Sequence, residues 1–303
     1  MTSWIQRPPI GRRTHAWFHA RRWQRLLLLA AVAALPSTVA ATGHGPLFGL
    51  ATPTLGKGSW SLDSAVMGMS GDGHMLMARP VVGYGVTSDL QLSLSPPIPL
   101  FSTGSLARSR MMIMMPAQPD VELQLLWRLQ RRALGIGNRI ETTAGLYVDY
   151  PIESRVSGVR VYPGLGASLV TGYASRSWYF WAGGFYRRYL GPVGARADHV
   201  GDTAMYSAVV GYRPPFLQRR ELPRGDWRLF AELVGEYTFP DQLGGVQVAN
   251  TGGHRLFLGP TLLGLYGAWG VSGGVQLAIY DDLAGTQARD LIRYVVNFTY
   301  WWF

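Results

Sequence analysis

Cysteine is missing from all 303 residues. Its absence excludes disulfides, thiolate metal sites and a lipid anchor on an N-terminal cysteine. Lysine is nearly missing as well, because Lys57 is the only one and almost all positive charge is arginine. Only 15% of the residues are charged. A soluble β-sandwich needs a wet face rich in charge, so this composition counts against one.

Long apolar runs are also missing. The run Leu26–Leu35 holds about ten residues, well short of the roughly 20 that a membrane-spanning helix needs. An arginine-rich, acid-free segment precedes it, and the small residues Ser37–Ala41 follow it. This order of basic, apolar and small residues predicts a secretory signal peptide over residues 1–41, cleaved after Ala40 or Ala41. No later stretch approaches 18 apolar residues, which excludes helical spans.

The net charge of +10 owes much to that segment. Removing its six arginines from the 28 basic residues leaves 22 against 18 acidic residues, a net charge of +4. Such a small excess gives no support to a nucleic-acid partner.

The last residues of the chain alternate strictly. Residues 292, 294, 296, 298, 300 and 302 are all apolar, and the other face carries Arg293, Asn297 and Thr299. Period-two alternation places successive side chains on opposite sides of a sheet. An aromatic closing strand of this kind is typical of bacterial outer-membrane barrels. Tyr300, Trp302 and Phe303 are therefore the predicted assembly signal, read by the barrel-assembly machinery.

The same alternation recurs in twelve candidate strands: 60–68, 75–86, 90–95, 121–130, 140–150, 161–173, 177–189, 203–212, 227–239, 255–266, 271–279 and 291–303. Many run longer than the five or six residues common in soluble sheets and match the roughly 9–11 of tilted membrane strands. The predicted fold is all-β, a transmembrane antiparallel up-and-down barrel over residues 58–303. About twelve strands are expected, with ten or fourteen as alternatives.

This fold places the protein in the bacterial outer membrane, among its lipids. Residues 42–57 are expected to form an N-terminal arm in the periplasm or at the barrel mouth. The connections 87–89, 174–176 and 267–268 are short, and 96–119, 190–202, 240–253 and 281–290 are long. Short periplasmic turns and long outer loops are usual in such barrels. The connections 131–137 and 213–225 are longer than that rule expects.

One stretch resembles a known family. Residues 80–96, with the sequence PVVGYGVTSDLQLSLSP, resemble a recurring hairpin in the putative phenol meta-pathway-type outer-membrane proteins. The resemblance implies an outer-membrane barrel associated with transport, and it implies no catalytic residues.

Charged side chains on the predicted inward faces are the first functional candidates: Arg79, Glu122, Arg128, Glu141, Asp149, Arg187, Arg228, Glu232, Glu236, Arg255 and Arg293. Rings of such groups line aqueous pores and bias ion passage. The same mixture of signs can instead pair across the lumen and close it. The predicted function is passive or facilitated passage of a small solute, without a strong preference for either ion sign.

Methionine supports an alternative function. Met67, Met69, Met75 and Met77 surround His74, and Met111, Met112, Met114 and Met115 crowd the longest predicted outer loop. Soft thioethers select Cu(I), and histidine adds a borderline ligand. The alternative is therefore a barrel that handles soft metal ions such as copper. The competing explanation is that methionine serves as a flexible apolar filler.

Six tryptophans, at positions 178, 181, 227, 269, 301 and 302, are expected to anchor the barrel at the membrane interfaces.

A barrel enzyme is the remaining alternative, and we expect the protein not to be one. A serine hydrolase of this architecture needs a serine beside a histidine, commonly as His-x-Ser on one strand. None of His44, His74, His199 and His254 has a serine two residues later. An enzyme would require a serine or carboxylate packed against His74 or His254 from a neighbouring strand. No cofactor is expected, because the glycines at 270–274 lie in a strand with no helix after them.

Overall fold

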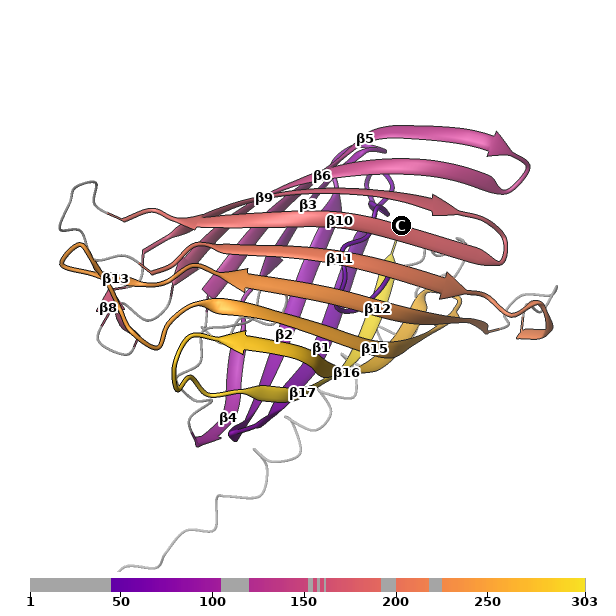
Figure 1. The fold of residues 1–303 in the computed structure, drawn as a ribbon. Helices are drawn as coiled ribbons and strands as arrows, with labels where there is room; N and C mark the ends of the chain where they lie inside the picture. Colours follow the sequence, from indigo (N-terminus) through magenta and orange to yellow (C-terminus); the bar gives the residue numbers. More distant parts are fainter. Residues whose placement is uncertain are drawn as a thin grey trace, which may run out of the picture. The chain divides into compact units, whose positions relative to one another are not determined.

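The computed structural model describes residues 45–104, 120–151, 155–156, 159–160, 162–191, 200–217 and 225–302. Twelve strands form a closed antiparallel ring in chain order (Figure 1). They are β1 (Trp60–Gly71), β2 (Gly73–Gly85), β3 (Leu90–Ser95), β5 (Asp120–Gly135), β6 (Asn138–Pro151), β9 (Gly164–Ala174), β10 (Trp178–Tyr189), β11 (Thr203–Tyr212), β12 (Asp226–Thr238), β15 (Gly253–Tyr266), β16 (Trp269–Leu283) and β17 (Asp290–Trp302). Because β1 pairs with both β2 and β17, the first and last strands close the ring. The predicted fold class and strand count are confirmed.

The third strand of the ring is interrupted. Pro96 and Pro97 end β3, and the chain continues as β4 (Ile98–Gly104). Proline has no N–H to give to a ladder, which explains the break. β3 pairs with residues 82–85 of β2, and β4 pairs with residues 73–78 of the same strand.

The remaining elements are small. Two hairpins, β7 (Arg155–Val156) with β8 (Val159–Arg160) and β13 (Gln242–Leu243) with β14 (Val246–Gln247), lie in connections between ring strands. The 3₁₀ turn η2 (Pro215–Leu217) follows β11. Among the residues that the structure describes, no helix is long and apolar enough to cross a membrane.

One end of the barrel carries tight turns, at 86–89, 136–137, 175–177 and 267–268. We call it the tight-turn end and the opposite one the long-loop end. The connection 131–137 is not a long loop, because β5 and β6 extend through it to a two-residue turn. Gly137 in that turn has φ +81°, a conformation that favours glycine. The connection 213–225 is a genuine exception, and its residues 218–224 lie outside the described part.

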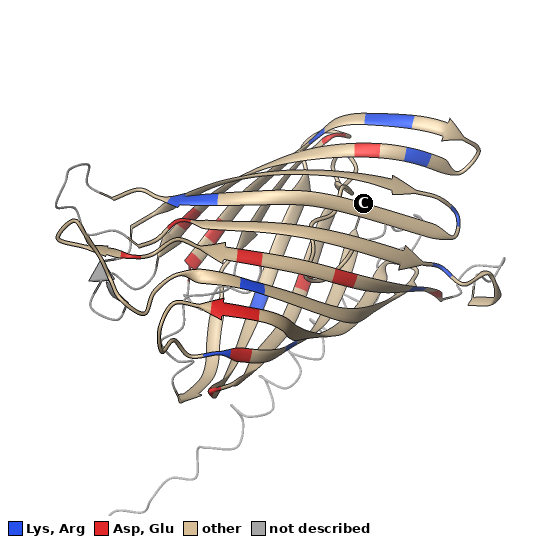
Figure 2. Cartoon of the chain, viewed as in Figure 1, with Lys and Arg blue, Asp and Glu red and all other residues tan. Residues whose placement is uncertain are grey.

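The outer face of the wall is apolar and the inner face is largely polar. On β17 the outward Tyr294 and Val296 are 38% and 61% exposed, whereas the inward Arg293 and Thr299 are each 3% exposed. Most residues of the barrel are neither acidic nor basic (Figure 2). Exposed aliphatic side chains around buried charged ones reverse the arrangement of a soluble protein. The wall is therefore that of a transmembrane barrel of the outer-membrane type.

Aromatic side chains ring both ends of the outer face. Tryptophans 60, 178, 227, 269 and 302 lie at the tight-turn ends of their strands and point outward, whereas tyrosines 186, 206, 237 and 280 lie near the long-loop end. The prediction of an interface anchor is wrong for Trp181 and Trp301. Their side chains are only 5% and 1% exposed, because each falls on the inward face of its alternating strand.

Candidate functional site

A segment preceding β1 lies inside the barrel and contributes to the candidate site. The backbone N–H groups of Leu47, Phe48 and Gly49 all donate to the carboxylate of Glu232, at 2.8, 2.8 and 2.7 Å. Glu232 lies in the middle of β12 and has no exposed surface. The hydroxyl of Thr261 on β15 also donates to this carboxylate, at 2.5 Å. One buried acid thus satisfies three consecutive backbone donors, an arrangement in which charge strengthens each bond.

Thr52 forms the second attachment. Its hydroxyl donates to Glu141 Oε2 at 3.3 Å and accepts from Trp181 Nε1 at 3.1 Å. The hydroxyl of Thr143 donates to the carbonyl of Thr52 at 2.7 Å. Glu141, Thr143 and Trp181 come from β6 and β10. This contact explains why a tryptophan points inward on β10: its indole N–H finds a partner there.

The segment is held at two further points. Leu50 donates its backbone N–H to Ser207 Oγ at 3.0 Å, and Leu55 donates to Gln91 Oε1 at 2.8 Å. We call residues 45–57 the arm. It is the described part of residues 42–57, which are predicted to lie in the periplasm or at the barrel mouth. For residues 47–52 that expectation is wrong, because their partners lie on the inward faces of the wall.

The arm packs closely against the wall at Gly49. A Cβ atom at this position would lie 2.7 Å from Val209 Cγ2 and 3.4 Å from Ser207 Cβ. Glycine therefore permits the approach that brings three amides to Glu232.

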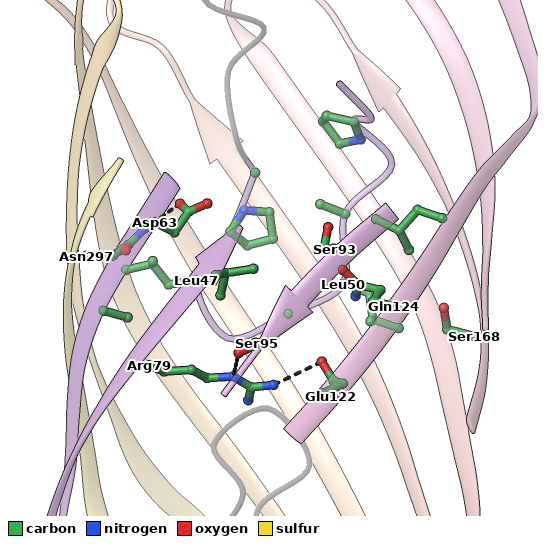
Figure 3. A pocket seen from close by; sticks show the side chains of 18 of the residues that line it. Leu47, Leu50, Asp63, Arg79, Ser93, Ser95, Glu122, Gln124, Ser168 and Asn297 are labelled. Carbon is green, nitrogen blue, oxygen red and sulfur yellow. Dashed lines mark hydrogen bonds and ion pairs between the residues drawn. The ribbon is translucent and has the colours of Figure 1, made fainter. Parts of the chain in front are cut away.

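All eleven predicted lumen charges lie on inward faces, and most are paired. Near the long-loop end, Arg79 contacts Glu122 at 2.9 Å, and Arg187 contacts Glu122 at 3.1 Å and Asp149 at 2.7 Å. These four residues belong to β2, β5, β6 and β10. Figure 3 shows Arg79 pointing at Ser95 and Glu122. Ion pairs thus tie together strands that are not all neighbours.

A second set of pairs lies on the other side of the ring. Arg293 contacts Glu236 and Asp290, each at 2.6 Å, and Arg255 pairs with Asp290 as well. The guanidinium of Arg293 also lies 3.5 Å from the ring centre of Phe257. Each of the four charged side chains is at most 3% exposed. The two sets leave little net charge at this level of the lumen.

The third set lies near the tight-turn end. Glu141 is within 3.1–3.6 Å of Arg128, Arg131 and Arg139. Arg128 also contacts Asp89, in the turn outside the strands, at 2.9 Å. Hydrogen bonds from Ser88 and from Arg128 lower the pKa of Asp89. The last of the eleven, Arg228, pairs with Asp226 at 2.8 Å.

A cavity of about 290 Å³ lies between the arm and the wall. Its volume is just below the roughly 300–1,000 Å³ usual for ligand sites. Leu47 and Leu50 of the arm border it (Figure 3). Its polar lining includes Asp63, Arg79, Ser93, Ser95, Glu122, Gln124, Ser168, Arg187 and Asn297, and its apolar lining includes Met67, Tyr147 and Phe185. The cavity therefore offers hydrogen-bonding groups and an apolar surface to one small molecule.

The predicted metal ligands do not all converge. Met67 is opposite Met77 in the β1–β2 ladder, and Met69 is opposite Met75. All four point inward and are at most 9% exposed. His74 is exposed on the outer face and does not join them. Met111, Met112, Met114 and Met115 lie outside the described residues. Within the described part, no group of three His, Asp or Glu side chains is placed to hold a metal ion.

The contacts required of a barrel enzyme are not found at the described histidines. His254 Nε2 lies 3.0 Å from the hydroxyl of Tyr206, on the outer face. In the part of the chain that the structure describes, neither His74 nor His254 hydrogen-bonds to a serine or a carboxylate. His44 and His199 lie outside that part.

Comparison with known proteins identifies the fold. No protein-family model matches the sequence, and no curated protein matches it. The COG4313 outer membrane channel from Pseudomonas putida F1 is similar in structure, with a TM-score of 0.60, 10% identity, and 82% of this chain and 97% of that one covered. Two further structures are more distant. KdgM porin has a TM-score of 0.42 and 13% identity, with 79% of this chain and 98% of that one covered. LpxR from Salmonella typhimurium has a TM-score of 0.42 and 12% identity, with 79% of this chain and 99% of that one covered. The likeness to the Pseudomonas putida channel shows a shared barrel fold.

Proposed function

We propose that this barrel passes a small solute across the bacterial outer membrane, through a lumen that the arm narrows. The cavity between the arm and the wall carries this proposal, because it combines polar groups with apolar surface inside a closed barrel. A molecule of that size would find hydrogen-bond partners on both the wall and the arm. Outer-membrane lipid surrounds the wall in this proposal.

The pairing of charges determines what kind of selectivity to expect. Rings of unpaired charge bias ion passage, whereas Arg79 and Arg187 share the carboxylates of Glu122 and Asp149. Selection would therefore depend on size and hydrogen bonding more than on the sign of charge. The eleven inward charges shape the passage mainly by fixing the inner wall.

Two resemblances to other proteins support solute passage as the function, in preference to other activities. The Pseudomonas putida protein that shares the fold is an outer membrane channel. Residues 80–96, which resemble the phenol meta-pathway-type proteins, form the hairpin of β2 and β3. We extend the proposal to membership of that family, and to insertion by the barrel-assembly machinery through Tyr300, Trp302 and Phe303.

The test is conductance of the protein purified from outer membranes after expression of the full-length chain. In a planar bilayer we expect small, discrete current steps, with a reversal potential close to zero in a salt gradient. Liposomes containing the protein should also swell in solutions of small neutral sugars. Folded protein that gives neither current nor swelling would contradict the proposal.

A further inference from the structure

The four inward methionines of β1 and β2 form one compact patch, which we call the methionine quartet. Met67 faces Met77 across the ladder, and Met69 faces Met75 two residues further along. Directly opposed residues in an antiparallel pair have Cβ atoms roughly 4.5–5.5 Å apart. Because each methionine side chain has three rotatable bonds, four thioether sulfurs can approach a common point.

The distribution of methionine argues against simple filling. The described residues contain five methionines, and only Met205 lies outside the quartet. Elsewhere the buried inward apolar positions carry other residues, such as Val170, Val234 and Phe257. If methionine served only to fill space, it would be expected wherever the inner wall has irregular gaps. The described methionines are instead concentrated in two facing pairs.

One member of the quartet borders the cavity. Met67 lines the cavity together with Asp63 and Glu122, while Met69 is 1% exposed and lies two residues nearer the long-loop end of β1. An ion that occupies the cavity therefore lies beside Met67, the first of the four methionines.

Two arginines lie next to the quartet, and both are paired with carboxylates. Arg293 is opposite Met69 in the β1–β17 ladder, and Arg79 follows Met77 on the same face of β2. Arg293 is held by Glu236 and Asp290, each at 2.6 Å, and Arg79 by Glu122 at 2.9 Å. Paired charges oppose an incoming cation far less than free ones, since each carboxylate cancels most of the field of its arginine.

We propose that the methionine quartet binds one soft, monovalent d¹⁰ cation, Cu(I) or Ag(I), through its thioether sulfurs. Thioether ligands select Cu(I) over hard divalent ions. The site needs no histidine, in line with the outward position of His74. It is independent of the passage of solutes, because binding needs only access through the cavity.

The probe is Ag⁺, supplied as nitrate in chloride-free buffer to the protein purified from outer membranes. Saturable binding is measured by equilibrium dialysis with elemental analysis. We expect one tightly bound Ag⁺ per chain, unaffected by excess Mg²⁺. In the variant M67L/M69L/M75L/M77L, which nearly conserves side-chain volume, that binding should weaken at least tenfold. The matched control M111L/M112L/M114L/M115L replaces four methionines elsewhere and should keep it.

A second measurement uses oxidation. Bound Ag⁺ should protect the quartet from conversion to sulfoxide by hydrogen peroxide, as followed by mass spectrometry of the peptides, while Met205 keeps its own rate. If the quartet variant does not migrate as a folded barrel in unboiled gels, M67L/M77L and M69L/M75L replace it in both assays. The proposal is overturned if the parent does not bind Ag⁺, or if folded quartet variants bind it as tightly as the parent.

Discussion

The barrel wall and the arm are held in opposite ways. Each strand of the wall is joined to two neighbours by ladders of backbone hydrogen bonds, ten to thirteen pairs long in most of the ring. The arm forms no ladder, and side chains at a few points hold it. The loss of one backbone hydrogen bond hardly weakens a ladder of ten or more residue pairs. The position of the arm, by contrast, depends on the side chains of a few single residues. The wall should therefore tolerate substitutions that displace the arm.

The substitution Glu232→Ala should have the largest effect. It removes the acceptor of three backbone donors, and hydrogen bonds to a charged group contribute about 1.5–3 kcal/mol each. We expect the arm to leave the wall, chymotrypsin to cut after Phe48, and single-channel conductance to rise several-fold. The barrel itself should still migrate as folded in unboiled gels.

Glu236→Ala is the matched control for that experiment. It deletes a carboxylate from the same face of β12, one that binds Arg293 and not the arm. Phe48 should stay protected from chymotrypsin in this variant. Equal cleavage in both variants would mean that Glu232 has no special role.

Arg187→Gln should have the next largest effect, and on the wall instead of the arm. Breaking a buried ion pair costs about 3–5 kcal/mol, and Arg187 is 3% exposed. Loss of its charge leaves Glu122 and Asp149 with a single arginine, Arg79, and Glu122 lines the cavity. We expect the reversal potential in a salt gradient to shift toward cation preference and thermal unfolding to begin at lower temperature.

The control here is Arg228→Gln, which removes the same charge from a residue that does not line the cavity. Its reversal potential should match that of the parent. A cation preference in both variants would show that the cavity charges do not govern ion passage.

Thr52→Val should have the smallest effect. The change removes the hydroxyl that joins Glu141 to Trp181 but keeps the backbone carbonyl that Thr143 binds. Leaving the buried indole N–H without a partner costs about 1–3 kcal/mol. We expect slow chymotrypsin cleavage after Phe48, clearly below that of Glu232→Ala. Cleavage as fast as in Glu232→Ala would place the main attachment at Thr52.

The same contrast explains what the sequence could predict. Alternation assigns each wall residue to a face, which correctly placed Glu141 and Glu232 inside and Tyr294 outside. Alternation says nothing of the partner of an inward side chain. The arm has no period, and its contacts join residues far apart in sequence, such as Leu47 with Glu232 and Thr52 with Glu141.

Two misassignments have a physical origin. Trp181 was assigned to the interface by residue type, although its neighbours Phe180 and Ala182 already mark the outward face of β10. His74 was grouped with four methionines because it is adjacent in sequence, but the same alternation turns it away from Met75. In both cases the strand period was a better guide than residue type.

The most direct test of the arm's place uses the absence of cysteine. Gly49→Cys and Ser207→Cys would bring two Cβ atoms about as close as in a disulfide, since a Cβ at Gly49 would lie 3.4 Å from Ser207 Cβ. Val209→Ala makes room for the new side chain. Combined with Glu232→Ala, this variant should form the disulfide during export and conduct like the parent until a reductant releases the arm. Conductance should then rise several-fold. If no disulfide forms, or if reduction leaves the conductance unchanged, the arm does not narrow the lumen as described.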